Sequence, residues 1–408
     1  MIHSSKYKPR VYDITGVTVS SEMDRIQSMS ASISLNREKV EELGREGQVC
    51  YKAGTPTVDL SVSQMEYGSL EFYQRLANTA DSDTIVTLAD YKTSMVNIGG
   101  FATDDDDTFL GTVFYPRQRV ASMNLSIGDP EALIERSFSL VGEDEYMYQN
   151  ANKYVIELVD TNAAGLSHQI VIGSGGFSDY PTPVDDPDNS GTYFIMASRI
   201  RSGTYTGLTE GTDFTYDSGT NTITIPLSAA SDTYKFWYTA TTYISGVSTF
   251  TDNDSDLCAI RGDSVSVYLE STNYLYRLQS ATIDVSFDRF DVREIGNKDI
   301  VARGINDTTI SVALGRSLED YTIEELLRNV YGESFGKIDI REFDDDLSLV
   351  VKIYSDNTKS TFKTGWKINN LAPISLGDGQ DLNAYFQRDV TLESSDTTSF
   401  VTNSEGEL

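Results

Sequence analysis

The segment Arg25–Gly44 reads RIQSMSASISLNREKVEELG, and the segment Arg277–Gly296, which begins 252 residues later, reads RLQSATIDVSFDRFDVREIG. Aligned without a gap, the two segments are identical at eight of 20 positions. Each begins with a strict alternation of apolar and polar residues, which is typical of a β-strand with one buried face. The chain therefore contains an internal repeat of a strand-forming unit. The identical pairs are Arg25/Arg277, Gln27/Gln279, Ser28/Ser280, Ser34/Ser286, Arg37/Arg289, Val40/Val292, Glu42/Glu294 and Gly44/Gly296.

The repeat continues beyond these two segments. Two more strand-like stretches match at the same offset, and a Gly-Asp pair matches near the end of each copy. Agreement of several elements in the same order is not expected by chance, so the sequence predicts two homologous domains, residues 1–145 and 251–408. The further matches are Val58–Val62 with Ile310–Leu314, Arg136–Leu140 with Arg388–Leu392, and Gly128-Asp129 with Gly377-Asp378.

Residues 146–250 have no counterpart in the repeat. Within them, Thr212–Ile225 alternates in hydrophobicity around Ser218-Gly219, which predicts a β-hairpin, and Tyr234–Tyr238 predicts the next strand. The expected fold class is mainly β, with two tandem β-sandwich domains, short flanking helices and an inserted β-sandwich at 146–250. The helices are predicted at Leu70–Asn78, from Thr322 to Gly332, and as a single turn from Pro130 to Arg136.

Composition excludes several classes of function. The 408 residues include 62 acidic and 32 basic side chains, and a net charge of −30 argues against tight wrapping of nucleic acid. The two histidines, His3 and His168, and the two cysteines, Cys50 and Cys258, are too few for a zinc site or a conventional catalytic triad. We therefore expect no enzyme and no cofactor. The sequence contains no apolar run of about 18 residues, so no membrane span is predicted. No secretory signal is expected in Met1–Arg10.

Two local patterns leave alternatives open. Asp252–Asp263 resembles a calcium loop, but Leu257 stands where that loop needs Gly and Asp263 where it needs Glu, so a solvated acidic linker is favoured. A bridge between Cys50 and Cys258 requires their Cα atoms to lie within about 7 Å. Two unpaired thiols that act as small apolar side chains are the favoured interpretation.

The repeated unit resembles a known family. An alternating strand, a charged segment ending in Glu-Leu-Gly or Glu-Ile-Gly, a polar loop, a second strand and a helix resemble the tail tube (major tail) proteins of long-tailed bacterial and archaeal viruses. The segments Glu135–Leu140 and Gln387–Leu392 are similar to the last strand of that family. The insert is similar to the accessory immunoglobulin-like domains of virion proteins.

The resemblance implies a structural role. In this family each tube domain gives part of its sheet to a closed inner barrel, six domains make a ring, and stacked rings make the channel through which DNA leaves. Two tube domains in one chain imply a trimeric, pseudo-hexameric ring, and a barrel of about 24 strands has a diameter on the order of 50 Å. The expected partners are the chain itself, the tape measure, terminator and distal tail proteins and, transiently and without tight binding, viral double-stranded DNA. The expected place is the virion tail, assembled in the host cytoplasm, with no membrane partner.

The alternation predicts which residues line the channel. The apolar sets, Met29, Ala31, Ile33 and Leu35 in the first copy and Ala281, Ile283, Val285 and Phe287 in the second, are expected in the sandwich core. The polar set has no Lys or Arg that would hold phosphates and slow a sliding duplex. The predicted lumen-facing residues are Ser28, Ser30, Ser32, Ser34, Asp59, Ser61, Ser63, Ser280, Thr282, Asp284, Ser286 and Ser311.

Two other functions remain open at this point. A baseplate or distal-tail hub protein shares the tube fold but forms one ring instead of a stack. A receptor- or glycan-binding adhesin would act through the insert, with Phe236, Trp237 and Tyr238 as a sugar platform, although these aromatic residues are better explained as core.

Overall fold

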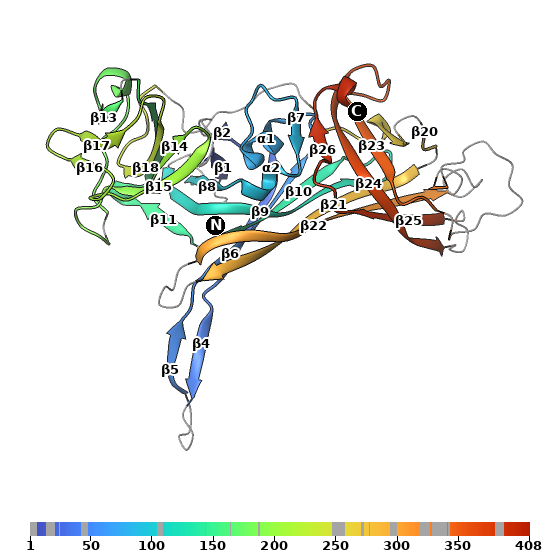
Figure 1. Ribbon diagram of the computed structural model, residues 1–408, viewed down its shortest axis with the longest axis horizontal. Coiled ribbons are helices and arrows are strands. Elements are labelled where there is room, and N and C mark those ends of the chain that lie inside the picture. Colours follow the sequence, from blue (N-terminus) through green and yellow to red (C-terminus); the bar gives the residue numbers. More distant parts are fainter. Residues whose placement is uncertain are drawn as a thin grey trace, which may run out of the picture. The chain divides into compact units, whose positions relative to one another are not determined.

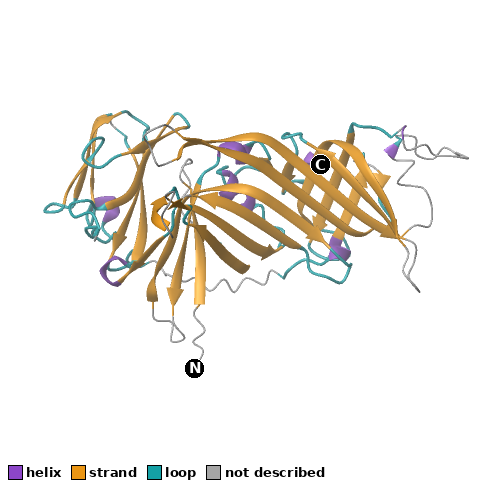
Figure 2. Ribbon diagram, turned by 90° about the horizontal axis from the view of Figure 1, so that it is seen from below, coloured by secondary structure: helices purple, strands orange, loops and turns teal. Residues whose placement is uncertain are grey.

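The structure is a computed structural model in which strands predominate (Figures 1 and 2), so the predicted mainly β fold is confirmed. The chain divides into two compact units. Unit 1 comprises Met1–Asp24, Ser94–Gln118 and Gly142–Asp254, and unit 2 comprises Arg25–Thr93, Arg119–Val141 and Ser255–Leu408. The structure describes residues 6–13, 21–23, 25–41, 48–103, 109–142, 144–163, 165–186, 188–246, 258–270, 273–276, 278–293, 300–317, 327–328, 341, 343–379 and 387–408.

Unit 2 is built on one sheet in which eight strands follow the order β3-β6-β10-β9-β21-β22-β25-β24. The first four strands come from the first copy of the repeat and the last four from the second. Of the long strand β9, only the part after Gln118 belongs to this unit. The strands are β3 (Ile26–Ser34), β6 (Thr57–Met65), β10 (Glu135–Gly142), β9 (Phe109–Ile127), β21 (Leu278–Arg293), β22 (Ile300–Ser317), β25 (Gln387–Ser394) and β24 (Phe362–Gly379).

The hydrogen-bond register of the first hairpin is repeated in the second. In the β3–β6 ladder Ile33 lies opposite Val58, and in the β21–β22 ladder Val285 lies opposite Ile310, which is the same pair shifted by 252 positions. The ribbon of β4 (Arg37–Glu41) and β5 (Gln48–Ala53), drawn in blue in Figure 1, matches the far halves of β21 and β22 in the same way. The bulges also coincide, at Ile26/Ser28 with Leu278/Ser280 and at Val40/Glu41 with Val292/Arg293.

The β10–β9 and β25–β24 ladders correspond in the same way with a small change of offset. Phe138 lies opposite Met123 in β10–β9, and Val390 lies opposite Leu376 in β25–β24, so one strand is shifted by 252 positions and its partner by 253. This register aligns Gly377 with Asn124, and the predicted match of Gly128-Asp129 with Gly377-Asp378 is therefore wrong. The matching strands are β1 (Lys6–Asp13) with β19 (Val265–Leu269), β2 (Ser21–Glu22) with β20 (Asn273–Tyr274), β8 (Val96–Thr103) with β23 (Leu347–Tyr354), and β11 (Tyr146–Gln149) with β26 (Phe400–Thr402).

Helices are few in the described part of the chain. The predicted helix at Leu70–Asn78 is confirmed as α1 (Glu71–Ala77), whereas α2 (Asp90–Thr93) and the short strand β7 (Ile85–Thr87) were not expected. The helical turn predicted from Pro130 to Arg136 is wrong, because Glu135 and Arg136 already pair with β9 as the start of β10. The helix predicted from Thr322 to Gly332 lies outside the described residues apart from Leu327 and Arg328.

The core of unit 2 lies on one face of the eight-stranded sheet. Phe138 of β10 contacts Phe72 and Tyr73 of α1, with ring centroids 4.8 and 5.7 Å apart. Tyr91 of α2 packs on Phe287 of β21 at 6.0 Å. The helices therefore cover the apolar face of the sheet and leave the opposite face to solvent.

Residues 154–240 of unit 1 form two sheets that share an apolar core. Ile156 and Phe236 of the first sheet and Ile170 and Ile223 of the second are all buried in one cluster. The predicted hairpin is confirmed, since Asp217 pairs with Thr222 across its turn. The sheets are β12 (Tyr154–Thr161), β18 (Thr233–Ala240), β14 (Phe194–Arg201) and β15 (Thr204–Leu208), and β13 (Leu166–Val171), β17 (Thr222–Ser228) and β16 (Thr215–Asp217). The insert is thus a two-sheet sandwich, while the domain limits at 145/146 and 250/251 stay predictions.

A carboxylate anchors one end of this sandwich. Asp232, which is fully buried, accepts hydrogen bonds from the Arg201 guanidinium at 2.6 and 2.7 Å, from the Ala229 N–H at 2.8 Å and from the Tyr234 hydroxyl at 3.1 Å. The hydrogen bonds from Arg201 are the largest cause that lowers the pKa of Asp232 to about 2. The ionised carboxylate is thus stabilised by folding.

We predict an acid-dependent loss of stability at Asp232. An unfolded Asp has a pKa of about 3.9, so the contribution of this group is complete above about pH 4 and is lost as the pH falls towards 2. In a Trp366→Phe background, which leaves Trp237 as the reporter, Asp232→Asn should lower the free energy of unfolding at pH 7 by on the order of 1–2 kcal/mol. Urea titrations should show a smaller difference between the two proteins at pH 2.5, and an unchanged difference would contradict the assignment.

A buried ion pair connects β10 to the loop before α1. Arg136 donates from Nε to Oε1 of Gln64 at 2.8 Å and from a terminal nitrogen to Oε2 of Glu66 at 3.3 Å, and Arg136 and Glu66 are both almost completely buried. Burial is the largest single influence and lowers the pKa of Arg136, but Glu66, Tyr73 and Tyr91 together exceed it, and the pKa of Arg136 is raised. The repeat partner, Arg388, instead pairs with a half-exposed Asp378 at 2.6 Å.

Arg136 and Arg388 provide a matched test. Arg136→Met leaves the Glu66 carboxylate buried without its cation and should cost about 3–5 kcal/mol of unfolding free energy. Arg388→Met removes an exposed pair and should cost less than about 1 kcal/mol. Denaturant unfolding measures both, and equal costs would contradict the assignment of Arg136 to the core.

Candidate assembly edges and polar face

The predicted lumen-facing residues all lie on the solvent side of β3, β6, β21 and β22. Their neighbours in sequence point the other way, and Val58, Leu60 and Val62 of β6 are fully buried. Across the strands the polar residues meet in pairs, such as Ser30 with Ser61 and Asp284 with Ser311. Their position inside a channel stays a prediction, but the structure does place them on one face.

Sequence reasoning missed the middle of this face. In β9 the alternating residues Ser122, Asn124 and Ser126 lie opposite Ser286, Asp284 and Thr282 of β21. The Asn124 side-chain amide donates to Asp284 at 2.6 Å. The alternation from Ala121 to Ile127 was visible in the sequence, but this strand has no close match in the second copy.

The charged residues of this polar face are acidic. It also includes Ser137 and Ser139 of β10 and Thr391 of β25, and its charges come from Asp59, Asp284, Asp288, Asp307, Glu135, Asp389 and Glu393. Over these paired positions, all within the described residues, there is no Lys or Arg. Arg119 lies beyond the bulge that ends the face on β9.

The two copies differ sharply in how their first strand is covered. In β21 the apolar residues Val285 and Phe287 are 1% and 3% exposed, whereas the matching Ile33 and Leu35 next to β3 are 43% and 54% exposed. The expectation that the apolar residues of the first copy fill the core is therefore wrong for a single chain. The reason is local, since β21 has β9 on its second edge and Tyr91 above Phe287, whereas in the described part of the chain β3 pairs with β6 alone.

The two ends of the eight-stranded sheet are complementary. β21 and β9 form a ladder of six paired positions in the middle of the sheet. β3 is the repeat equivalent of β21, and β24 is the repeat equivalent of β9. Among the residues that the structure describes, no strand pairs with the outer edge of β3 or with the outer edge of β24 at Ser375–Gly379. The two outer strands, β3 and β24, are thus equivalent to the two strands that pair with each other in the middle of the sheet.

An arginine fastens the β9–β21 junction where its ladder ends. Arg289 donates from Nε to the carbonyl oxygen of Val120 at 2.6 Å and from a terminal nitrogen to that of Tyr91 at 2.9 Å. Burial, with the nearby Arg119 and Arg303, lowers the pKa of Arg289 to about 9. Its repeat equivalent is Arg37, which is exposed.

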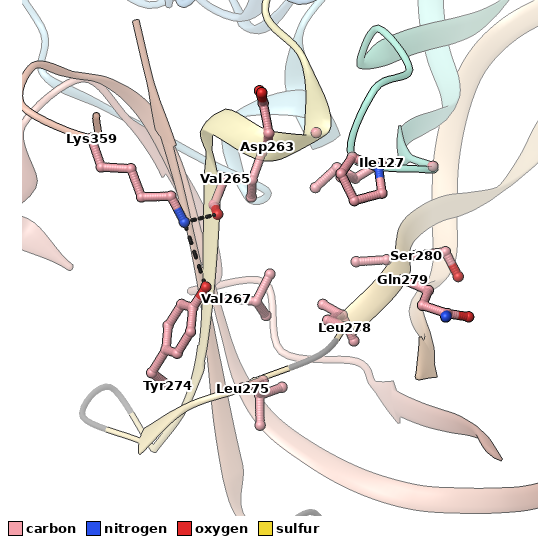
Figure 3. Close-up of a pocket in the computed structure, with 14 residues that line it drawn as sticks. Ile127, Asp263, Val265, Val267, Tyr274, Leu275, Leu278, Gln279, Ser280 and Lys359 are labelled. Carbon is pink, nitrogen blue, oxygen red and sulfur yellow. Dashed lines mark hydrogen bonds between the residues drawn. The ribbon is translucent and has the colours of Figure 1, made fainter. Parts of the chain in front are cut away.

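A small hollow of about 160 Å³ lies beside the same junction (Figure 3). Leu278 and Ser280 at the start of β21 and Ile127 at the end of β9 line it. The Lys359 ammonium on its rim donates to the carbonyl oxygen of Val265 at 2.7 Å and reaches the Tyr274 hydroxyl at 3.5 Å. The Lys359 ammonium is therefore used in contacts within the fold. The residues that line the hollow do not indicate a catalytic or ligand-binding site.

Other candidate sites resolve as follows. Neither Cys50 nor Cys258 forms a disulfide, which confirms that part of the favoured interpretation. Both are exposed, so their role as small apolar side chains is wrong. The candidate calcium loop lies mostly outside the described residues, which contain no cluster of three His, Cys, Asp or Glu side chains suited to a metal ion. Phe236, Trp237 and Tyr238 are fully buried, so they form no sugar platform. In the described part of the chain no helix has the length and apolarity to cross a bilayer.

Comparisons with known proteins include a weak likeness to a solved structure. No family model and no curated protein matches the chain. Among solved structures, a chain of the sheath–tube complex of an extracellular contractile injection system (PVC) in its extended state matches. It is 14% identical with a TM-score of 0.28 and covers 38% of this chain and 100% of its own length. A likeness this low carries no argument, and the proposals below depend on the strands of this chain.

The exposure contrast predicts the outcome of two matched substitutions. Val285→Asp puts a carboxylate into the core and should cost several kcal/mol of unfolding free energy. Ile33→Asp, at the equivalent position of β3, should cost less than about 1 kcal/mol when the chain is monomeric. Denaturant unfolding at low protein concentration measures both, and a large cost at Ile33 would show that β3 is already covered in the monomer.

Proposed function

We propose that the protein is a tail tube protein of a long-tailed bacterial or archaeal virus. Its chains would associate into rings, and the rings would stack into a tube that conducts DNA. The observation that carries the proposal is the eight-stranded sheet of unit 2, whose two outer edges are copies of the strands paired at its centre.

Such edges favour a closed ring. A contact between two different surfaces of the same chain repeats until it closes, or else it continues as an open filament. With eight strands in the sheet of each chain, three chains supply 24 strands and six copies of the repeat. A barrel of that size has a diameter on the order of 50 Å, which accommodates a DNA duplex.

The polar face is the side of the sheet that would form the channel wall. The opposite face is covered by α1 and α2, so it is already occupied by the core. A wall of Ser, Thr, Asn and acidic residues binds no phosphate through counter-ion release, and a duplex beside it stays hydrated and free to move. The lumen-facing residues, the ring partners and the transient contact with DNA all follow from this placement.

The proposal extends to partners and location. A tube of this kind ends on other tail proteins, so we assign the tape measure, terminator and distal tail proteins as further partners and the virion tail as the site. A baseplate or distal-tail hub protein remains the alternative, because it has the same fold. It differs in forming a single ring that does not stack. The adhesin alternative loses its only named platform, since the three aromatic residues are buried.

Electron microscopy and native mass spectrometry of the purified protein test the proposal. We expect rings with the mass of three chains of 45.1 kDa each, and longer tubes at high concentration. Rings that never stack would favour the hub protein. A chain that stays monomeric at all concentrations and salt conditions would contradict both.

A further inference from the structure

We infer that β3 of one chain adds to the outer edge of β24 in a second copy of this chain, in the register set by the internal β9–β21 junction. Ser34 then lies opposite Ser375, Ile33 opposite Leu376, and Ser30 opposite Gly379. Arg37 fastens this contact by donating to the carbonyl oxygen of Pro373 in the second copy. The inference rests on the proposed self-assembly and names the surface through which it occurs.

The register follows from two offsets that the structure contains. Ser286 lies opposite Ser122 and Val285 opposite Met123 in the internal junction. β3 precedes β21 by 252 positions, and β24 follows β9 by 253 positions. Applying both offsets converts the internal pairs into the pairs between chains. The bulge between Pro373 and Ser375, which matches the one beside Val120, keeps the geometry of the two edges the same.

The side chains at these positions suit the contact. Val285 and Met123 are the repeat equivalents of Ile33 and Leu376, and they are 1% and 2% exposed. Pairing would place Ile33 in similar apolar surroundings, and burial of an aliphatic side chain stabilises an interface. The polar pair Ser34 and Ser375 reproduces the internal pair Ser286 and Ser122 and stays on the polar face.

The sequence of β3 lacks the charges, the prolines and the very short length that commonly keep sheet edges apart. Natural edge strands are blunted by Lys, Pro, inward-pointing charges or very short length. β3 reads IQSMSASIS over nine residues and contains neither a charge nor a proline. An edge of this kind is built to be paired, and the internal junction shows which strand pairs with it.

Arg37 matches Arg289 in sequence, in position and in the site that it would reach. The residue equivalent to Val120, whose carbonyl oxygen accepts from Arg289, is Pro373. Proline is tolerated at bulges and at sheet edges because its missing N–H is not needed there, and its carbonyl oxygen can still accept. The exposed guanidinium of Arg37 thus has a defined acceptor in the second copy, as Arg289 has within the chain.

Cysteine pairs test the register directly, in a background with Cys50→Ser and Cys258→Ser. Ser34→Cys with Ser375→Cys should form disulfides between chains under mild oxidation, because directly opposite Cα atoms lie within the range for a disulfide. Ser286→Cys with Ser122→Cys, the same pair in the internal junction, should close within one chain and give no ladder on a denaturing gel. Ser30→Cys with Ser375→Cys, four residues out of register, should remain uncrosslinked.

A second measurement tests Arg37. Arg37→Ala should weaken chain association about 10- to 100-fold, since a hydrogen bond from a charged group is worth about 1.5–3 kcal/mol. Lys52→Ala, which removes another exposed cation from the same hairpin, should leave association unchanged. Association constants from sedimentation velocity measure both, and equal effects of the two substitutions would overturn the role of Arg37.

The outcomes separate this inference from the proposed function. Rings in the micrographs without a Ser34–Ser375 crosslink, or with a crosslink only in the out-of-register variant, would overturn the register and leave the tube function standing. A parent protein that never associates would overturn the proposed function itself.

Discussion

The β9–β21 ladder is the interaction on which the architecture of unit 2 depends. It joins the last strand of the first four-stranded group to the first strand of the second, and so makes one sheet from two copies of one unit. The apolar residues of β21 are buried, and Arg289 at the end of the ladder is half-buried and donates to the carbonyl oxygen of Val120. Both copies have the same internal register. The ladder therefore also shows which partner strand is missing at the outer edges of β3 and β24.

The burial data follow from this constraint. Val285 is buried and Ile33 is not, although both occupy the same position in identical ladders. The same contrast recurs at another strand pair, where Val401 of β26 is buried beside β7 and its equivalent, Met147 of β11, is 72% exposed. Duplication within a chain would replace three of six contacts in a ring with covalently linked ones, which lowers the entropy cost of assembly.

Much of this fold could be predicted from the sequence, because strand alternation and a constant offset carry register as well as topology. The matching of Val58–Val62 with Ile310–Leu314 identifies pairs that the ladders contain. The offset of the last strands, β10 and β25, was predicted, but the offset of β24 from β9 was not, since one inserted position shifts β24 without changing its pattern. The turn at Pro130 resembled a helix locally, but pairing of Arg136 with β9 and its ion pair with Glu66 overrode the local preference.

The exposure of Ile33 and Leu35 could not be predicted from alternation, because period two assigns a residue to a face and does not say whether that face is covered. Backbone hydrogen exchange in β3 and β21 measures this cover most directly, before and after assembly. We predict that the β3 amides that point away from β6 exchange rapidly in the isolated chain while their β21 counterparts are protected, and that assembly slows them to the β21 rates. Equal protection of β3 and β21 in the isolated chain, or no change at β3 on assembly, would contradict the role of these edges.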